Sequence, residues 1–414
     1  MIASLVGLLL FMDFIETFSF LSLHNRPSSV LRSLSSEQME KETEPRNPPD
    51  GSYSYSFWSK AFMSQEQEFD YKIEEIIGEL PRSLRGTLFR NMPALFERGE
   101  TDYGHYLDGD GYVMRVVFDG LGGATFKSKF VRSREFESEA AAGKVLFRST
   151  FGTQRPARPV SLFGQEVDLS NVLDLKLKNL ANTNVLYHHN RLFALFEAGT
   201  PYELCPRSLE TLGTADMSIG LKEGLAVCVP ALRRALPAVH DAFFGEYFTA
   251  HPKKIGRNLV AWTTRGMPVP GRALDTNPLL EFIEWGDKGT LSTPPAHQRT
   301  RVLLDKTAVA PHDFSLTPQS YVLVQNRMGG DLMPYLTGKR CPAQCISVDT
   351  EMAMVLSIVP RPIANEPNAL DTTQMGTRST ATATATIQEE QTREPGRFFG
   401  AGERLDLPLS PGFT

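Results

Sequence analysis

The sequence predicts a fold dominated by β-structure. From residue 57 to residue 360, short runs of β-branched, aromatic and aliphatic residues alternate with turn residues. Hydrophobic residues make up 41% of the chain and aromatic residues 10%, which is enough to build a sizeable core. Many short strands in succession are typical of a sandwich, a barrel or a propeller. No WD-type or kelch-type repeat selects among the three.

The first 56 residues differ in composition from the rest. Ile2 to Met12 is an apolar run, too short to span a bilayer, and residues 17–36 contain serines and arginines but no acid. Residues 1–36 therefore suggest a targeting segment for a plastid, and a misplaced start codon is the alternative. If the segment is not a plastid signal, we expect a cytoplasmic or membrane-associated protein. Residues 37–56 are polar and predict a linker.

The strand-like runs follow in order along residues 57–360. Val113–Phe118 is closed by the turn pair Asp119-Gly120, and in Ala124–Val131 alternate residues share one face. The later runs are Asn184–Tyr187, Leu192–Phe196, Leu259–Thr263, Arg301–Leu304, Tyr321–Val324 and Met354–Pro360.

One segment interrupts this β rhythm. Leu221–Phe244 has leucines and valines at helical spacing, broken by Pro230 and Pro237. If the helix is exposed, it is suited to peripheral contact with a membrane; if buried, it packs against the sheets. The buried arrangement is the more ordinary one, and we expect it.

The tail changes character again. Residues 361–400 carry a Thr-Ala tract and predict a low-complexity, flexible segment, because they bury too little apolar surface to order themselves. Residues 401–414 contain a strand-like remnant that suggests the start of a further sheet.

Charge and motif content exclude several functions. The net charge of −5 carries no basic stripe, so we expect no nucleic-acid partner. There is no HExxH, GxSxG, P-loop or GxGxxG motif. Cys341 and Cys345 lack a second cysteine pair or a nearby histidine, which does not favour a zinc site.

Two of the eight histidines lie in distinctive contexts. His251 precedes Pro252, which disfavours helix and places the imidazole on extended backbone. His312 is followed by Asp313 and precedes a strand-like run. They are 61 positions apart, so they belong to different β units and meet only if the fold brings the units to a common axis. Imidazole is a ligand for iron, copper, nickel or zinc.

Six ordered motifs, from about residue 70 to about residue 360, resemble the carotenoid oxygenase family. In order they are Leu84–Asn91 with Pro93; His105–Gly111, which contains Asp-Gly-Asp-Gly; Asn182–Val185; Leu195–Glu197 with Pro201–Leu204 and Leu209–Gly213; Ala250–Lys253; and His312–Phe314. We read Asp108 to Gly111 as a tight turn, with glycines at positive φ and acids bonded to turn amides. The family usually has glycine where this chain has Met92.

The resemblance implies a seven-bladed β-propeller with helices capping one face. It implies a ferrous ion held on the axis by four histidines, with glutamates bonded to their far nitrogens. His251 and His312 match two of these ligands, and Glu197 matches a glutamate expected to bond His312. The implied reaction uses O2 to cleave a conjugated double bond of a carotenoid or apocarotenoid.

The match is incomplete. No histidine follows His312, so two of the family's ligands have no counterpart, and the last blades are expected to be missing. We therefore expect little oxygenase activity from the chain as written. Three alternatives remain open: an enzyme recorded in truncated or mis-spliced form, an inactive propeller that binds a carotenoid or a protein, and a scaffold without ligand.

Overall fold

A computed structural model describes residues 63–227, 230–256, 258–269, 276–286, 299–304, 307, 309–326, 328–348, 354–361 and 405–408. The expected targeting segment (1–36) and linker (37–56) lie outside these residues. So do residues 57–62, the expected low-complexity segment from residue 362 to residue 400, and most of the final remnant. None of the described helices is both long and apolar enough to cross a bilayer.

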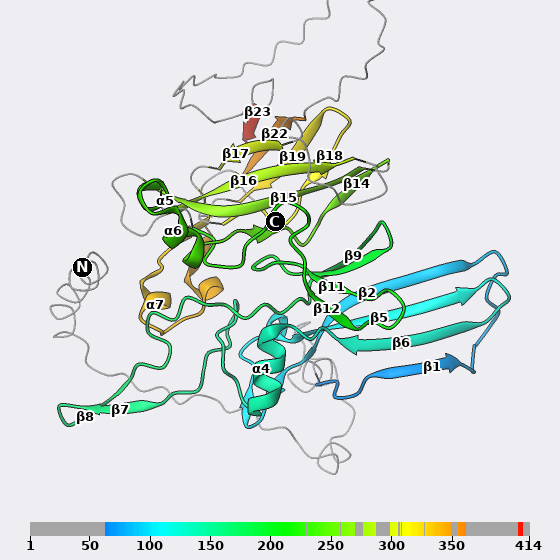
Figure 1. Cartoon of the computed structure of the whole chain (residues 1–414), viewed down its shortest axis with the longest axis horizontal. Coiled ribbons are helices and arrows are strands. Elements are labelled where there is room, and N and C mark those ends of the chain that lie inside the picture. Colours follow the sequence, from blue (N-terminus) through cyan, green and yellow to red (C-terminus); the bar gives the residue numbers. More distant parts are fainter. Residues whose placement is uncertain are drawn as a thin grey trace, which may run out of the picture. The chain divides into compact units, whose positions relative to one another are not determined.

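Four antiparallel sheets contain most of the described strands (Figure 1). The first sheet has the order β1-β6-β5-β2, the second β12-β11-β10-β9, the third β13-β15-β16-β17 with β14 also paired to β15, and the fourth β18-β19-β22-β23. The first two sheets consist of β1 (Phe69–Ile73), β2 (Arg85–Leu95), β5 (Asp110–Asp119), β6 (Ala124–Phe130), β9 (Asn184–His188), β10 (Arg191–Leu195), β11 (Tyr202–Leu204) and β12 (Thr211–Thr214). The other two consist of β13 (Tyr247–Phe248), β14 (Lys253–Ile255), β15 (Asn258–Pro268), β16 (Thr276–Trp285), β17 (Arg299–Leu303), β18 (Ser315–Leu316), β19 (Ser320–Gln325), β22 (Val355–Pro360) and β23 (Leu405–Pro408).

Each strand-like run of the sequence matches one of these strands to within one residue beyond its end, and the predicted β-rich fold is confirmed. Alternation explains the pairing of β5 with β6, where Val113 and Phe130 point into buried layers while the Asp119 turn is exposed. The remaining short strands form three two-stranded sheets: β3 (Glu97–Arg98) with β4 (Thr101–Asp102), β7 (Pro159–Leu162) with β8 (Gln165–Asp168), and β20 (Met328–Gly330) with β21 (Ile346–Val348).

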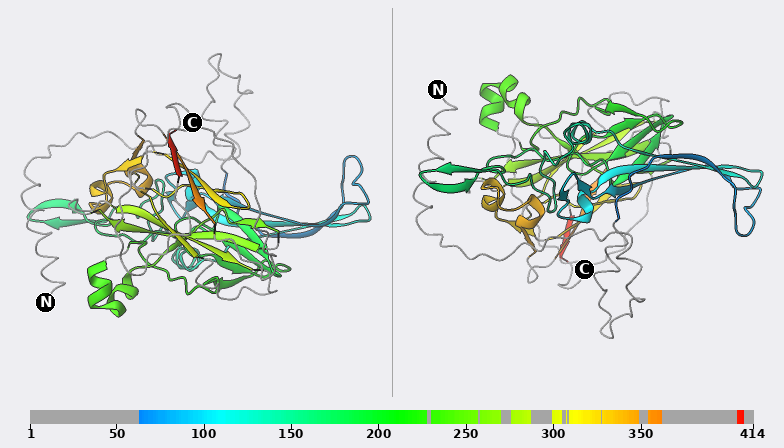
Figure 2. Two further views of the ribbon diagram at one scale, coloured as in Figure 1. Left: turned by 90° about the horizontal axis from the view of Figure 1, so that it is seen from above. Right: turned by 90° about the horizontal axis from the view of Figure 1, so that it is seen from below.

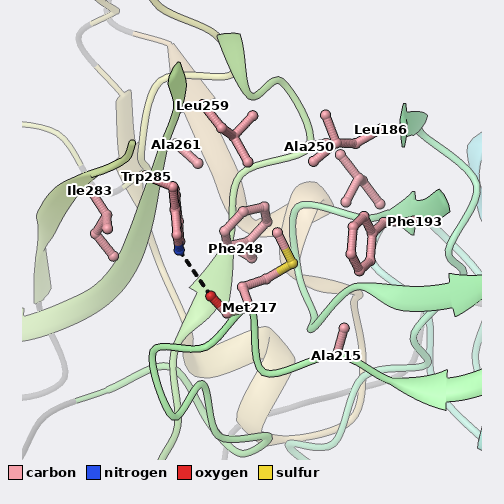
Figure 3. Close-up of a cluster of buried hydrophobic side chains, with 11 residues drawn as sticks. Leu186, Phe193, Ala215, Met217, Phe248, Ala250, Leu259, Ala261, Ile283 and Trp285 are labelled. Atoms are coloured by element: carbon pink, nitrogen blue, oxygen red, sulfur yellow. Dashed lines mark hydrogen bonds between the residues drawn. The ribbon is translucent and has the colours of Figure 1, made fainter. Parts of the chain in front are cut away.

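Apolar layers join each of the four sheets to the next. Leu259 and Ala261 of β15 pack in one cluster with Phe193 of β10 (Figure 3), and the alternate residues Val260 and Trp262 pack in another with strands of the fourth sheet. A third cluster joins the first sheet to the second. Two further views show these strand groups from above and below (Figure 2). Because β15 is buried on both faces, the third sheet is the middle of a stack, as in a propeller.

The described helices are few and short. They are α4 (Arg134–Ala142), α5 (Pro230–Ala235), α6 (Pro237–Phe243) and α7 (Met333–Leu336), with the 3-10 turns η2 (Tyr106–Asp108) and η4 (Pro342–Cys345). Ser133 caps α4 by accepting the Phe136 N–H, and Gly143 ends it in the left-handed conformation. Its Phe136 packs on Phe130 of β6 and Tyr112 of β5, so a capped helix packs on one face of that sheet.

The helix expected at Leu221–Phe244 is wrong in its extent and its burial. Helix begins only at Pro230, and residues 221–227 form turns and isolated bridges instead. A second helix starts at Pro237, because proline is tolerated in the first turn of a helix but not in its interior. Leu236 and Val239 are exposed, so this segment is not the buried packing helix that we expected.

The strand-like remnant near the end of the chain is also assigned differently. Leu405–Pro408 pairs antiparallel with β22, with Leu405 opposite Ile358 and Pro408 opposite Val355. It therefore adds an edge strand to the fourth sheet and does not begin a further one. Backbone pairing with β22 determines this position, and a strand pattern in the sequence does not reveal its partner.

Candidate metal site

Three residues that are distant in the sequence lie together. Glu197 follows the end of β10 in the second sheet, His251 lies between β13 and β14 in the third, and His312 precedes β18 in the fourth. One possible ligand atom from each lies within 4.8 Å of the other two. The expected meeting of His251 and His312 at a junction of β units is thus observed, and the junction involves three successive sheets.

The two imidazoles and the carboxylate are in direct contact. His312 Nδ1 lies 2.7 Å from Glu197 Oε1, and His251 Nε2 lies 4.0 Å from the same oxygen. The two rings are edge to face, with centroids 4.3 Å apart. The side chain of His251 is 23% exposed and that of His312 66%, so solvent reaches the site from the His312 side.

The environments of the two histidines shift their pKa values in opposite directions. Burial, and then the charge of His312, lowers the pKa of His251 below its usual value. The contact with the Glu197 carboxylate raises the pKa of His312, and this outweighs its partial burial. His251 is therefore the more readily neutral of the two imidazoles, while Glu197 favours a proton on Nδ1 of His312.

Backbone contacts hold the segment that carries His251. Its own N–H donates to Thr249 Oγ1 at 3.1 Å, and the Asn184 side-chain amide donates to the carbonyl of Ala250 at 2.9 Å. Asn184 belongs to β9, so this bond joins the second sheet to the segment. Asn91 of β2 in turn donates to the carbonyl of Asn184 at 3.0 Å. The asparagines of the two motifs thus link neighbouring sheets beside the site, a role that the sequence analysis did not assign.

The residues present fit a metal ion. His251 Nε2 is buried and has no hydrogen-bond partner among the described residues, although a buried polar atom normally has one. A histidine that donates Nδ1–H to a carboxylate, as His312 can to Glu197, keeps the lone pair of Nε2 for a metal. Among the residues that the structure describes, these three form the one group of at least three histidine, cysteine or acidic side chains with metal-ligand spacing.

The Asp108 to Gly111 segment is structural, but the expected reason is wrong. Gly109 has φ −61°, and Gly111 is not among the described positive-φ residues. A Cβ at Gly111 would lie 2.3 Å from the Ala181 carbonyl oxygen. The glycine is needed because another backbone passes closely, and not because of a left-handed turn.

The two acids of this segment bond distant parts of the chain and not their own turn. Asp108 accepts the backbone N–H groups of Phe151, Gly152 and Thr153, at 2.8 to 3.0 Å. Asp110 lies 2.7 Å from Lys178, which also contacts Glu139 at 2.7 Å.

All three charged side chains, Asp110, Lys178 and Glu139, are at most 2% exposed, so they form a buried ionic cluster. Burial acts to lower the pKa of Lys178, but the neighbouring acids outweigh it and hold that pKa above its usual value.

A polar hollow of about 210 Å³ lies beside the second sheet and is separate in its lining from the histidine site. Its walls include Arg191, Asp216 and Glu223, and none of the three site residues lines it. Arg191 is already bound through two nitrogens to Glu203, at 2.8 and 2.7 Å. The one cation of this lining is therefore already paired.

Comparison with known proteins gives consistent matches. A family model described as retinal pigment epithelial membrane protein matches residues 62–383. Apocarotenoid-15,15'-oxygenase from Synechocystis is 32% identical over 324 residues, which cover 76% of this chain and 57% of that protein. Carotenoid cleavage dioxygenase 7, chloroplastic, from Oryza sativa is 28% identical over 334 residues, which cover 72% and 50%.

The similarity extends to solved structures. The crystal structure of cobalt-substituted Synechocystis apocarotenoid oxygenase superimposes with a TM-score of 0.60 at 30% identity. The superposition covers 75% of this chain and 57% of that one. The chain therefore spans a little over half the length of these Synechocystis relatives. The range that the family model matches, residues 62–383, includes all three site residues.

Proposed function

Because the chain belongs to the carotenoid oxygenase family, whose model is described as retinal pigment epithelial membrane protein, we propose that it cleaves a carotenoid or apocarotenoid oxidatively. The reaction splits one conjugated carbon–carbon double bond with one molecule of O2. Each carbon of the broken bond receives one oxygen atom, so two carbonyl products, aldehydes in the simplest case, account for all the atoms.

The convergence of His251, His312 and Glu197 from three sheets is the observation that carries this proposal. The three residues lie within 4.8 Å of one another although 115 positions separate the first from the last. Ordinary packing does not require two imidazoles and a carboxylate to meet at a sheet junction. The substrate class is supported by the names of the relatives, which act on apocarotenoids and carotenoids.

We assign ferrous iron to the site, with His251 and His312 as ligands. Ferrous iron, when bound, supplies the redox chemistry that makes dioxygen reactive toward an alkene. That a Synechocystis relative accepts cobalt supports a divalent ion at the corresponding place.

The protein's own residues prepare this site. Among the described residues, no hydrogen-bond partner competes for the buried Nε2 of His251, and burial lowers the pKa of His251, which favours the neutral imidazole that binds a metal. The 2.7 Å contact of Glu197 Oε1 with Nδ1 of His312 favours a proton on that nitrogen, so Nε2 is the atom that would bind the metal.

We also propose peripheral contact with a membrane through residues 221–244. The side chains of Leu236 and Val239 are 49% and 43% exposed, and Arg233 and Arg234 lie on the same pair of helices. Apolar side chains beside cations suit the boundary between lipid headgroups and acyl chains, where a carotenoid would be drawn from. The chloroplastic relatives support a plastid location.

Product analysis tests the proposed activity. The purified full chain is loaded anaerobically with Fe²⁺, given an apocarotenal in detergent, and exposed to ¹⁸O2. We expect two carbonyl products by mass spectrometry, each with label, in low yield because the sequence has no histidine after His312 to complete the set of four that the resemblance implies. Both products should be lost in the double variant His251→Ala/His312→Ala.

His105→Asn is the matched control for this test. His105 caps η2 outside the site, and asparagine retains a cap acceptor, so this variant should keep activity. Carotenoid that is bound but never cleaved by the iron-loaded chain would contradict the activity and favour a binding protein.

A further inference from the structure

An ion pair joins the two segments that carry the histidines. Lys253 Nζ lies 2.7 Å from Asp313 Oδ1 and 2.8 Å from Oδ2. Lys253 is two residues after His251, and Asp313 directly follows His312. We propose that Lys253 and Asp313 are positioning residues that set the separation of the two imidazoles for a metal ion; this inference rests on the proposed metal site.

The pair is close enough to each histidine to act on it. Two residues of extended chain span at most about 7 Å, so the Cα atom of Lys253 lies within about that distance of the Cα atom of His251. Asp313 is the residue directly after His312. Lys253 begins β14 of the third sheet, and Asp313 precedes β18 of the fourth. Each histidine is thus held from its own sheet, and the ion pair is a direct side-chain bond between the two segments.

Asp313 is itself anchored to the core. Its Oδ1 accepts the backbone N–H of Phe314 at 2.7 Å, and Phe314 is 3% exposed within the apolar layer between the third and fourth sheets. The ammonium of Lys253 also lies 5.9 Å from the centre of the Phe314 ring. The carboxylate therefore offers Lys253 a fixed partner and not a mobile surface acid.

Because the ion pair is partly exposed, its effect on metal binding can be measured apart from its effect on the stability of the fold. The side chains of Lys253 and Asp313 are 32% and 45% exposed, and such pairs contribute little to the free energy of unfolding. Their loss should leave the fold intact but allow the two segments to move apart. A tie worth up to about 1 kcal/mol corresponds to a loss of metal affinity of up to about fivefold.

Lys254 provides a matched control. It is the neighbouring lysine, it is exposed, and its Nζ donates to the carbonyl of Tyr187 at 2.6 Å. This bond reaches the second sheet and does not touch the segment of His312. Lys254→Gln removes the same charge one position away without releasing the proposed tie.

Cobalt titration of the full chain tests the inference. Co²⁺ is added to metal-free protein, and the dissociation constant and the visible absorption bands are measured for the wild type, K253Q, D313N, K253Q/D313N, K253R and K254Q. We expect affinities about three- to fivefold weaker for each of K253Q and D313N, with altered bands, and no further loss in the double variant. K253R should restore much of the affinity, and K254Q should match the wild type.

Thermal unfolding accompanies each titration. Melting temperatures of K253Q and D313N should fall by less than about 4 °C, which excludes a general loss of structure. Unaltered cobalt binding in K253Q, additive losses in the double variant, or an equal effect of K254Q would overturn the positioning role alone. If the double variant His251→Ala/His312→Ala binds cobalt as tightly as the wild type, the proposed metal site is wrong and this inference fails with it.

Discussion

At the residue scale, the site shows how identical side chains acquire different properties. His251 and His312 are in contact, yet burial lowers the pKa of the first and Glu197 raises that of the second. The motif resemblance indicated these three residues and the pairing of Glu197 with His312. It did not indicate a role for Asn184 or for the Lys253–Asp313 ion pair, although these residues also belong to the six motifs. Their hydrogen-bond partners depend on which sheets are neighbours in the fold.

The buried ionic cluster gives a prediction at this scale. Lys178→Met leaves Glu139 buried without its cation, while Asp110 keeps Arg98 at 3.1 Å. Removing one member of a buried ion pair typically costs about 3–5 kcal/mol. We expect a loss of that size in the free energy of unfolding, measured by urea denaturation.

Lys254→Met, at the surface, serves as the control for this substitution and should change stability by less than about 1 kcal/mol. Equal effects of the two substitutions would show that the buried ionic cluster contributes no more to stability than a surface lysine.

Cysteine reactivity gives a second prediction. Hydrogen bonds from Ser208 lower the pKa of Cys205, whereas burial raises the pKa of Cys341 to about 12. The thiolate is the reactive form, so at pH 8 iodoacetamide should modify Cys205 much faster than Cys341 in the folded chain. Peptide mass spectrometry over time measures both rates, and unfolding in urea should remove the difference. Faster labelling of Cys341 in the native protein would contradict the described burial.

At the element scale, strands were predicted better than helices. Alternation predicts β6, and short apolar runs bounded by turn residues predict β5 and β15, because such patterns report burial on one or both faces. Helix α4 is not among the predicted elements, although Ser133 and Gly143 mark its two ends in the sequence. Around residues 221–244 the helical spacing was real, but spacing does not determine whether the apolar face is covered.

The close passage at Gly111 gives a prediction for an element. Gly111 donates its N–H to the Leu180 carbonyl and lies against the Ala181 backbone, so the start of β5 fits directly onto the segment before β9. Gly111→Ala places a methyl group against backbone atoms that cannot rotate away, and we expect a loss of about 3 kcal/mol in the free energy of unfolding.

Gly286→Ala is the control, because nothing in the described part of the chain lies within 4 Å of its added Cβ. Denaturant melts of the two variants make the comparison, and a neutral Gly111→Ala would refute the close approach.

At the scale of the whole described unit, consecutive sheets stack through shared apolar layers, and the site lies where three of them meet. Composition and pattern predicted many strands but could not choose among sandwich, barrel and propeller, because stacking depends on contacts between residues far apart in sequence. The motif resemblance supplied that choice. It follows that the site exists only when the second, third and fourth sheets are packed together.

The central claim is that His251 and His312, oriented in part by Glu197, bind a divalent metal ion. The most direct test is anomalous diffraction at the cobalt edge from crystals of the full chain soaked in Co²⁺. We predict an anomalous peak within bonding distance of an imidazole nitrogen of both histidines, with Glu197 still in contact with His312. A peak elsewhere with none between these two rings, at saturating cobalt, would contradict the account.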